Sequence, residues 1–383
     1  MLENVFEPMI AKLAPLAEVH VMLPAPWREK YRAVASAQAT SWCHEVTWHP
    51  LDAVDGDLAA LDLNGPTPEI LEAADAIAPD HCLCRSANSS LPERLPGRVR
   101  YVMEAGAPPF RLPSHWVSLQ PQIFDHGLMP DLPPEQRAAL IALIAHAWEE
   151  IERARRRDPT WRSRHGLPDR RTIIALPLDY EHADNLFGIH RSIRPNAALA
   201  AHLADRMRAP LFLAVTDHPL NVRFVDQRNL IETIDARSGV AQLLHRNPTA
   251  GDITSALTQH ADGMIVGDSK SFSAAAFYGT PLLRMSRFAS APWLCAYEDP
   301  DSFVADLAAE NAVAARREDA MLWFAHYLAA QAFAPRDADV TGAEILGRIA
   351  GDVGPKRWPD WFARVTQLQH GADEQVTAKE AGK

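Results

Sequence analysis

The chain has 383 residues, of which 47% are hydrophobic and 23% are charged. This composition is typical of a soluble globular protein, and at roughly 100–200 residues per domain the length predicts two domains. The formal net charge of −11 excludes the overall electrostatic match that a general nucleic-acid-binding protein needs, so no nucleic-acid partner is expected.

The four cysteines do not indicate a metal site. Cys82 and Cys84 follow His81, but a zinc site needs a second ligand pair at suitable spacing, and the sequence has none. The low cysteine count fits a reducing cytoplasm. No stretch approaches the ~20 apolar residues of a membrane helix, and the start lacks the regions of a signal peptide. We therefore expect a cytoplasmic protein without a metal.

Helix and strand patterns alternate over residues 1–158, which we interpret as a first α/β domain. An amphipathic helix opens it, and the apolar run 18–24 then predicts a buried parallel strand. The later elements expected in this half are a helix at 31–38, a strand at 45–49, a helix at 68–77, a strand at 99–103 and a long amphipathic helix at 133–157.

An arginine-rich segment follows the long helix. Residues 153–171 contain eight arginines and only two acids, together with prolines and a glycine. We interpret residues 159–171 as a basic interdomain linker. A solvated helix end and loop explains this composition. The alternative is contact with anionic lipid headgroups, as in a peripheral protein of the inner membrane.

Residues 172–350 show a second α/β pattern, and 351–383 predict a C-terminal helix and a disordered tail. The expected strands are 171–178, 210–216, 229–234, 263–266 and 281–285, and the expected helices are 195–208, 250–260, 271–278, 301–309 and 318–334. Such alternation predicts a parallel sheet with helices on both faces. Two such domains predict a cleft between them, a usual place for a ligand.

The turn from Gly267 to Ser273 is shaped to hold an anion. A strand ends at Gly267 and a helix starts within the next residues, at the edge of the sheet where ligands bind. Free backbone N–H groups there favour a phosphate. Ser269, Ser271 and Ser273 add hydroxyl donors, and Lys270 adds a charge. One of the polar residues could simply cap the helix, and the spacing is not that of a P-loop.

His218 and Pro219 directly follow another buried strand. Parallel strands end at the same edge of their sheet, so His218 is expected at the same edge as the serine turn. A histidine after a strand also has an ordinary structural explanation, and Pro219 fixes the local chain direction. The two features together favour an anion site more strongly than either alone.

These motifs resemble those of bacterial capsular polysaccharide glycosyltransferases of the GT-B type, most closely the Kdo-transferring enzymes. The resemblance covers about residues 99–290. It rests on His218-Pro219, on the serine turn followed by Ala-Ala-Ala-Phe-Tyr-Gly-Thr-Pro at 274–281, and on a strand ending in an acid near a glycine at 101–106. The block 175–180 also looks like the first strand of the second domain in that family.

The resemblance implies two Rossmann-like domains facing a cleft, with 1–158 on the acceptor side and 172–350 binding the donor. It implies that a sugar, Kdo or a related acidic sugar, is transferred from a CMP-linked nucleotide-sugar donor. The acceptor would be a glycan or glycolipid in the synthesis of a surface polysaccharide. The donor is a co-substrate, and no cofactor is implied. The donor phosphate would be held by His218, Pro219, Ser269, Lys270, Ser271 and Ser273.

The catalytic base is expected to be Glu104, at the end of the strand 99–103. The Kdo enzymes often have an acidic pair before the glycine, whereas Ala105 precedes Gly106 here. Glu104 could instead be an ion-pair partner. Asp125 and His126 are alternative bases, since a histidine titrates near neutral pH.

Further polar residues are candidates for contacts with the substrate. Asp179, Tyr180, His182 and Asn185 follow the first strand of the second domain, although four polar residues after a strand are also an ordinary loop. Arg284, at the end of the strand 281–285, could meet an anionic sugar or a phosphate.

Three other functions fit the same patterns. A polyol-phosphate transferase would use the same phosphate turn. A non-catalytic protein that binds a nucleotide or glycan in polysaccharide assembly would explain Ala105. A sugar-nucleotide epimerase has the same two-domain architecture and needs no acceptor.

Overall fold

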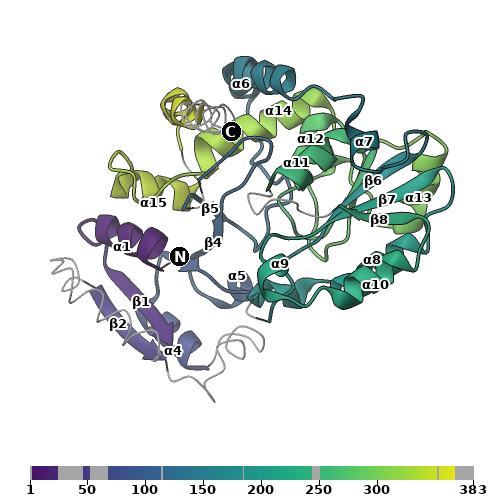
Figure 1. The fold of residues 1–383 in the computed structure, drawn as a ribbon. Coiled ribbons are helices and arrows are strands. Elements are labelled where there is room, and N and C mark those ends of the chain that lie inside the picture. The colour runs from purple at the N-terminus through teal and green to yellow at the C-terminus, as the bar shows by residue number, and fades with distance from the viewer. Residues whose placement is uncertain are drawn as a thin grey trace, which may run out of the picture. The chain divides into compact units, whose positions relative to one another are not determined.

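The computed structural model contains two compact units, and both are α/β with parallel strand pairs (Figure 1). The residues that the structure describes are 2–24, 46–51, 68–113, 115–183, 185–243, 251–351 and 353–366. Unit 1 lies within Met1–Ala105, Leu112–Phe124 and Leu328–Trp361. Unit 2 lies within Gly106–Arg111, Asp125–Tyr327 and Phe362–Lys383. The predicted α/β fold class is confirmed at this level.

Unit 1 contains two small sheets. In one, β1 (Val19–Pro24) pairs in parallel with β2 (Val46–Leu51). In the other, β4 (Arg98–Glu104) lies between β3 (His81–Cys84), which is parallel to it, and β5 (Val117–Gln120), which is antiparallel. Among the described residues, the helical segments of the unit include η1 (Leu2–Phe6), α1 (Glu7–Leu13), α4 (Pro68–Ile77), α5 (Leu91–Arg94), α15 (Gly342–Ala350) and η7 (Pro355–Arg357).

The core of unit 1 joins segments from opposite ends of the chain. Met9 of α1 packs with Val102 of β4 and with Ile345 of α15. Figure 1 shows α1 beside α15, although more than 300 residues separate them in sequence. The amphipathic face predicted for the first residues is therefore buried against the C-terminal part of the same unit.

Unit 2 is built on a five-stranded parallel sheet with the order β10-β9-β6-β7-β8. This is the order of a doubly wound Rossmann sheet. The chain forms β6, β7 and β8 in order toward one edge of the sheet, and then β9 and β10 toward the other edge. The direction in which strands are added therefore reverses between β6 and β9. The strands are β6 (Thr172–Pro177), β7 (Leu211–Thr216), β8 (Val240–Leu243), β9 (Gly263–Val266) and β10 (Leu282–Arg284).

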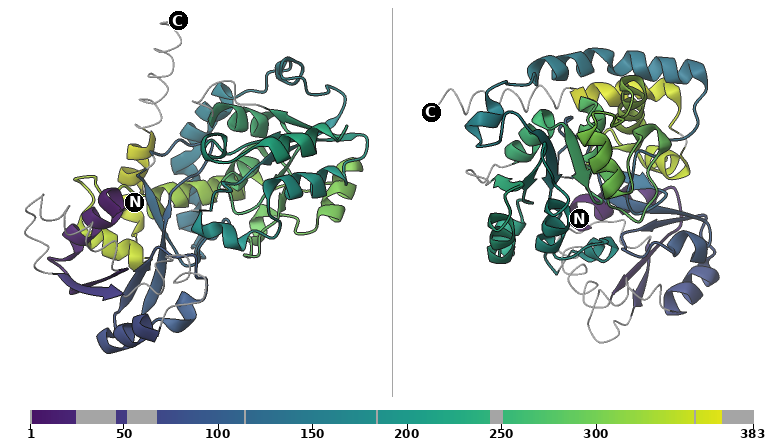
Figure 2. Two further views of the ribbon diagram at one scale, coloured as in Figure 1. Left: turned by 60° about the horizontal axis from the view of Figure 1, so that its bottom comes forward. Right: turned by 90° about the vertical axis from the view of Figure 1, so that its right-hand side faces the viewer.

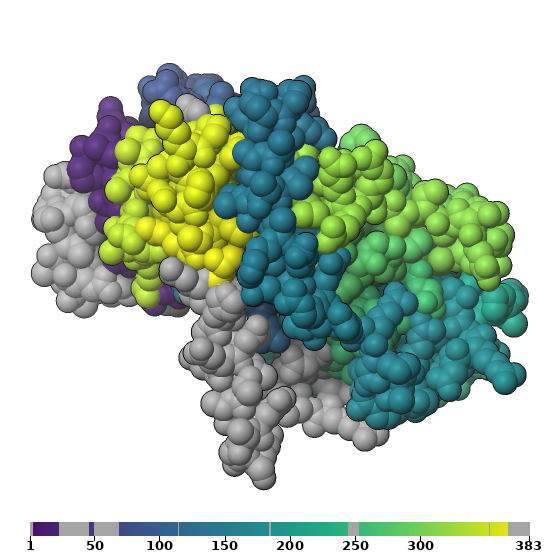
Figure 3. Space-filling view, turned by 90° about the horizontal axis from the view of Figure 1, so that it is seen from above, coloured from purple at the N-terminus to yellow at the C-terminus, as the bar shows by residue number. Residues whose placement is uncertain are grey.

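Helices cover both faces of this sheet (Figures 1 and 2). On one face lie α8 (Asn196–Ala204), α10 (Arg228–Asp235) and α13 (Pro300–Ala308), whose apolar residues share one core with the strands. On the other face lie α11 (Gly251–His260) and α12 (Phe272–Tyr278). Outside them α6 (Pro134–Ala154) runs along α14 (Arg317–His326), as Figure 3 shows. Shorter helical segments are α7 (Trp161–Arg164), η4 (Leu186–His190), α9 (Asn221–Phe224), η5 (Pro292–Leu294) and η6 (Tyr327–Gln331).

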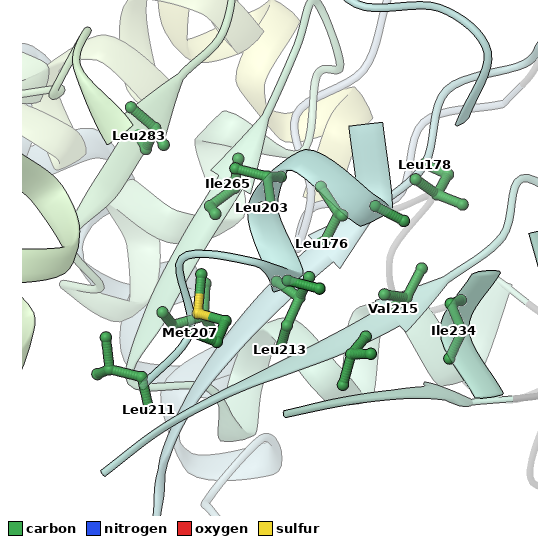
Figure 4. Close-up of a cluster of buried hydrophobic side chains, with 14 of the residues drawn as sticks. Leu176, Leu178, Leu203, Met207, Leu211, Leu213, Val215, Ile234, Ile265 and Leu283 are labelled. Carbon is green, nitrogen blue, oxygen red and sulfur yellow. The ribbon is translucent and has the colours of Figure 1, made fainter. Parts of the chain in front are cut away.

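The core beneath α8 and α10 explains why the strands of unit 2 are continuous apolar runs in the sequence. Leu176, Leu213 and Ile265 point from three neighbouring strands into this cluster, where Leu203 of α8 and Ile234 of α10 meet them (Figure 4). A parallel strand covered by helices on both faces needs apolar residues at successive positions.

Most elements agree with the sequence, but the segment 229–234 does not. It was expected as a strand and forms helix α10. Leu230 and Ile234 are buried four residues apart, whereas Ile231 is 40% exposed, which is the period of a helix with one apolar face. The edge strand is β8, which the sequence did not indicate, and β3 and β5 were also missed. The helix expected at 31–38 lies outside the described residues.

The arginine-rich segment is packed onto unit 2. The ring of Trp161 stacks between His165 and His260, at centroid distances of 4.2 and 4.7 Å. Arg157 donates to the backbone carbonyls of Gln259 and Ala261. The arginine-rich segment 153–171 therefore contacts the corner between α11 and β9. Residues 125–158 belong to unit 2 by their contacts. From the sequence they were expected in the first domain.

No helix within the described ranges is long and apolar enough to cross a membrane.

The register of α10 can be tested with two isoleucines. We expect Ile234→Ala to lower the free energy of unfolding by roughly 2–5 kcal/mol because it leaves a cavity in the core. Ile231→Ala should change it by no more than about 0.5 kcal/mol because that side chain is exposed. Chemical denaturation of both variants measures the difference, and equal losses would contradict the helical register.

Candidate functional site

Polar residues gather where three neighbouring strands of unit 2 end. Asp179 follows β6, His218 follows β7, and the serine turn follows β9. The strand β6 lies between β9 and β7, and all three are parallel, so these loops share the carboxyl edge of the sheet. The edge expected from the sequence to hold both His218 and the serine turn is therefore present within one unit.

The loops after β6 and β9 meet closely at the point where the strand order reverses. A Cβ atom added to Gly267 would lie only 2.7 Å from Oδ2 of Asp179, so this carboxyl group occupies the space beside the glycine. Burial raises the pKa of Asp179 to about 6, although Arg191 opposes the shift. The glycine at position 267 lets this carboxyl group approach the backbone closely, since a side chain there would displace it.

The serine turn presents two hydroxyls that bond to each other. Ser269 Oγ donates to Ser271 Oγ at 3.1 Å, and the backbone N–H of Ser271 donates to Ser269 Oγ at 3.3 Å. Ser271 occupies the N-cap position of α12, but its side chain makes no capping bond. The simple capping role is therefore not what the Ser271 hydroxyl does. Ser269, Lys270 and Ser271 are half-buried.

Ser273 differs from the expectation of a phosphate ligand. Its side chain is fully buried, and Oγ lies 2.8 Å from the carbonyl oxygen of Pro108 and 2.9 Å from that of Lys270. A hydroxyl has one proton to donate, and here a carbonyl receives it. The stem of Lys270 packs over Gly106, because a Cβ added there would lie 2.7 Å from Cδ of the lysine. Ser273 therefore anchors the turn.

His218 lies in a row of rings contributed by two loops. Its ring is 5.5 Å from that of Tyr180, which stacks on His182 at 5.8 Å with an interplanar angle of 10°. Nδ1 of His218 accepts a hydrogen bond from the backbone N–H of Leu220 at 3.2 Å. A neutral ring in this geometry carries its proton on Nε2.

A buried asparagine that the sequence did not single out ties these loops together. Nδ2 of Asn221 donates to the carbonyl oxygen of Asp179 at 3.0 Å and to Oδ1 of Asp217 at 2.7 Å. Its Oδ1 accepts from the backbone N–H of Glu181 at 2.9 Å. Asn185, expected as a substrate ligand, donates to the carbonyl oxygen of Tyr180 at 2.7 Å and so closes its own loop.

A cluster of charged side chains lies beneath the turn. Oδ1 of Asp268 is 3.4 Å from Nε2 of His126 and 3.9 Å from a guanidinium nitrogen of Arg284, and it also accepts a hydrogen bond from Ser286 Oγ. The side chains of His126, Asp268 and Arg284 are 0%, 8% and 1% exposed. The side chains that pack beneath the serine turn thus include buried ionisable groups and are not only apolar.

Arg284 has the environment of a counter-ion. None of its three guanidinium nitrogens has a hydrogen-bond partner, and the guanidinium lies 5.4 Å from the ring centre of Phe272. Burial lowers the pKa of Arg284 to about 10, while Asp268, Asp179 and Asp125 oppose that shift. At 2% exposure, Arg284 is better placed to balance these carboxyl groups than to contact an anionic substrate.

Asp125 and His126 lie in this cluster, within unit 2. Oδ1 of Asp125 accepts from the backbone N–H of Leu128 at 3.0 Å, and burial raises the pKa of Asp125 to about 7. Nδ1 of His126 lies 3.2 Å from the carbonyl oxygen of Phe288, and burial lowers the pKa of its ring. A base must reach the proton that it takes. These buried side chains fit a structural role better than that of the base.

Glu104 ends β4 in unit 1 and is paired. Its Oε1 accepts a hydrogen bond from Arg85 at 2.6 Å, and its side chain is 42% exposed. The ion pair expected as one explanation for Glu104 is therefore present, and the carboxylate is accessible as well.

No group of three or more metal-ligating side chains occurs among the residues with a described placement.

Comparisons with known proteins give structural likeness alone. No protein-family model and no curated protein matches the chain. Among solved structures it is similar to the KpsC beta-Kdo 2,7 transferase of Thermosulfurimonas dismutans, with 13% identity and a TM-score of 0.48, over 87% of this chain and 98% of that chain. A glycosyl transferase family 9 structure from Veillonella parvula matches with 12% identity and a TM-score of 0.24, over 74% and 79%.

One of these structures is a Kdo transferase, the class of enzyme that the sequence motifs resemble. At these identities and scores the matches assign neither an activity nor a site residue to this chain.

The buried carboxyl group of Asp125 should make stability depend on pH. Because folding raises its pKa from the ordinary 3.8 to about 7, ionisation destabilises the fold as the pH rises through that range. We expect Asp125→Asn, which keeps an oxygen for the Leu128 N–H, to be more stable than wild type at pH 8 by roughly 3 kcal/mol. The advantage should vanish near pH 4.

Denaturant unfolding at several pH values measures this difference. Asp131→Asn, at an exposed position, is the matched control and should show no such trend. A constant difference between Asp125→Asn and wild type from pH 4 to pH 8 would show that the group is not buried as an acid.

Proposed function

We propose that this protein is a glycosyltransferase whose second domain binds a nucleotide-sugar donor at the carboxyl edge of the β6–β9 sheet. The observation that carries the proposal is the gathering of hydroxyl, ammonium and imidazole groups at this edge. Ser269, Lys270, Ser271 and His218 come from two loops of one parallel sheet. Ligands of such sheets bind beyond the carboxyl ends of the strands, where the strand order reverses.

These groups suit a phosphate that becomes a leaving group. As the glycosidic bond breaks, negative charge develops on the phosphate, and fixed donors stabilise it. The hydroxyls of Ser269 and Ser271 and the charge of Lys270 would supply such donors. His218 would donate through Nε2, because Nδ1 accepts the backbone N–H of Leu220. Pro219 would hold the chain direction at this point.

The ring row and the neighbouring acid would bind the rest of the donor. Tyr180 and His182 present stacked rings that would lie against the nucleotide base. Asp179, beside Gly267, would accept hydrogen bonds from donor hydroxyls. By the motif resemblance the donor is CMP-linked Kdo or a related acidic sugar. The acceptor is a glycan or glycolipid of a surface polysaccharide, reached by peripheral contact with the inner membrane.

Glu104 is the proposed general base. It is a partly exposed carboxylate at the end of a strand, and its partner Arg85 would fix its orientation. In the proposal it removes the proton from the acceptor hydroxyl during transfer. Residues 1–158 would supply the acceptor side and 172–350 the donor side.

The phosphate site predicts a loss of nucleotide affinity in two variants. We expect His218→Ala and Ser271→Ala each to weaken binding of CMP by about tenfold, because each removes one hydrogen-bond donor to the phosphate. Isothermal titration calorimetry measures the dissociation constants. His146→Ala and Ser163→Ala, at exposed positions on α6 and α7, are the matched controls and should bind as wild type does.

The ligand panel should include UDP, CMP-sugars and CDP-linked polyols. Unchanged affinity in both site variants would refute the phosphate site. Binding of a CDP-polyol with no response to any nucleotide sugar would replace the glycosyltransferase by a polyol-phosphate transferase.

The base predicts a separate loss of turnover. Glu104→Gln should lower kcat by about 10²–10⁴-fold and leave donor affinity unchanged, since the amide cannot accept the proton. Release of CMP from the donor in the presence of acceptor measures turnover, and Glu93→Gln is the control on the nearby α5. If Glu104→Gln turns over as wild type does, another residue is the base.

A further inference from the structure

Asp268, the residue that follows Gly267, is held by three residues from two other segments of unit 2. His126 comes from the loop after β5, Arg284 from the end of β10, and Ser286 from the loop after β10. All of them reach the same oxygen, Oδ1. An acid at the start of a helix usually caps it, but the N-cap of α12 is Ser271, three residues later. The carboxylate of Asp268 therefore binds the interior of the unit instead of the helix.

The contact with His126 is sensitive to where the ring protons are. Nδ1 of His126 faces the carbonyl oxygen of Phe288 at 3.2 Å, and Nε2 faces Asp268 Oδ1 at 3.4 Å. Both facing atoms are acceptors, so a neutral ring can satisfy only one of them, whereas an imidazolium satisfies both. Asp268 favours the charged ring, and burial opposes it and lowers the ring pKa. The position of the Asp268 carboxylate is thus coupled to His126.

The opposite end of the same strand offers a comparison. Asp262 immediately precedes β9 and is held in an equally specific way: Oδ2 accepts from Arg162 at 2.7 Å and from the backbone N–H of Ile173 at 2.9 Å. One aspartate thus fixes each end of β9. Only Asp268, at the carboxyl end, directly precedes Ser269 and the serine turn in the chain.

We propose that Asp268 is a positioning residue for the serine turn, which sets the orientation of Ser269 and Ser271 by holding their loop against His126, Arg284 and Ser286. The inference rests on the proposed function in that the turn would bind the donor phosphate. Asp268 itself does not touch the phosphate. A short loop that carries donors keeps their geometry only if neighbouring contacts hold it.

The test compares Asp268→Ala with Asp262→Ala in the full chain. We expect Asp268→Ala to weaken CMP binding by about tenfold and Asp262→Ala to leave it unchanged, even where the two variants lose similar thermal stability. Asp268→Asn keeps the size of the side chain and an oxygen for Ser286, so it should restore most of the affinity. Equal CMP affinity in Asp268→Ala and wild type would overturn the proposal.

A second measurement does not depend on any nucleotide. Hydrogen exchange of the backbone amides at 267–273 should be faster in Asp268→Ala than in wild type, and unchanged in Asp262→Ala. If wild type binds no nucleotide, the proposed function fails, and the exchange result still decides whether Asp268 holds the turn. Unchanged exchange at 267–273 in Asp268→Ala would overturn the positioning role by itself.

Discussion

The arrangement of the candidate site depends on the burial of one guanidinium among three carboxyl groups at the carboxyl edge of the second sheet. The guanidinium nitrogens of Arg284 have no hydrogen-bond partner, so the charge is balanced through space by Asp268, Asp179 and Asp125. A buried charge without compensation is costly, so the guanidinium of Arg284 needs carboxyl groups near it. The three acids come from three different loops, so this balance fixes those loops relative to one another.

Hydrogen bonds of buried side chains also connect the loops at this edge of the sheet. Asn221 bonds to the loops after β6 and β7 at once, and Ser273 ties the start of α12 to the carbonyl oxygen of Pro108. Neither side chain is exposed. The accessible groups of the edge, namely Ser269, Ser271 and His218, therefore stand on a layer of buried polar residues. A site supported in this way loses little entropy when a ligand binds.

The sequence predicted single elements well where their signals are local. The strand 263–266 and the helix 68–77 were placed at their observed ends, since apolar runs and their flanking residues mark them directly. The segment 229–234 failed because two aliphatic residues four apart in a short, polar stretch fit a strand and a helix equally. Tertiary packing of Leu230 and Ile234 decides between them.

The support of the site was not readable from the sequence for a different reason. The partners of Asp268 lie at positions 126, 284 and 286, and those of Asn221 lie at 179, 181 and 217. No short motif contains such sets. The expected phosphate ligands could be named from the sequence because they stand in two short runs, at 218–219 and 269–273. Asp125 and His126 were expected as alternative bases and Arg284 as a substrate contact, because polarity alone does not distinguish a functional group from a buried counter-ion.

The acidic layer must also be compatible with the phosphate that is proposed to bind at the serine turn. Burial raises the pKa of Asp179 to about 6 and that of Asp125 to about 7, so both acids ionise less readily than exposed ones. A phosphate placed at the serine turn would repel their ionised forms and favour their protonated forms still more. Binding of a phosphate at this edge would therefore be accompanied by proton uptake at Asp179 and Asp125, which reduces the electrostatic repulsion. The acidic layer beneath the proposed phosphate site is electrostatically tolerable because Asp179 and Asp125 can become neutral.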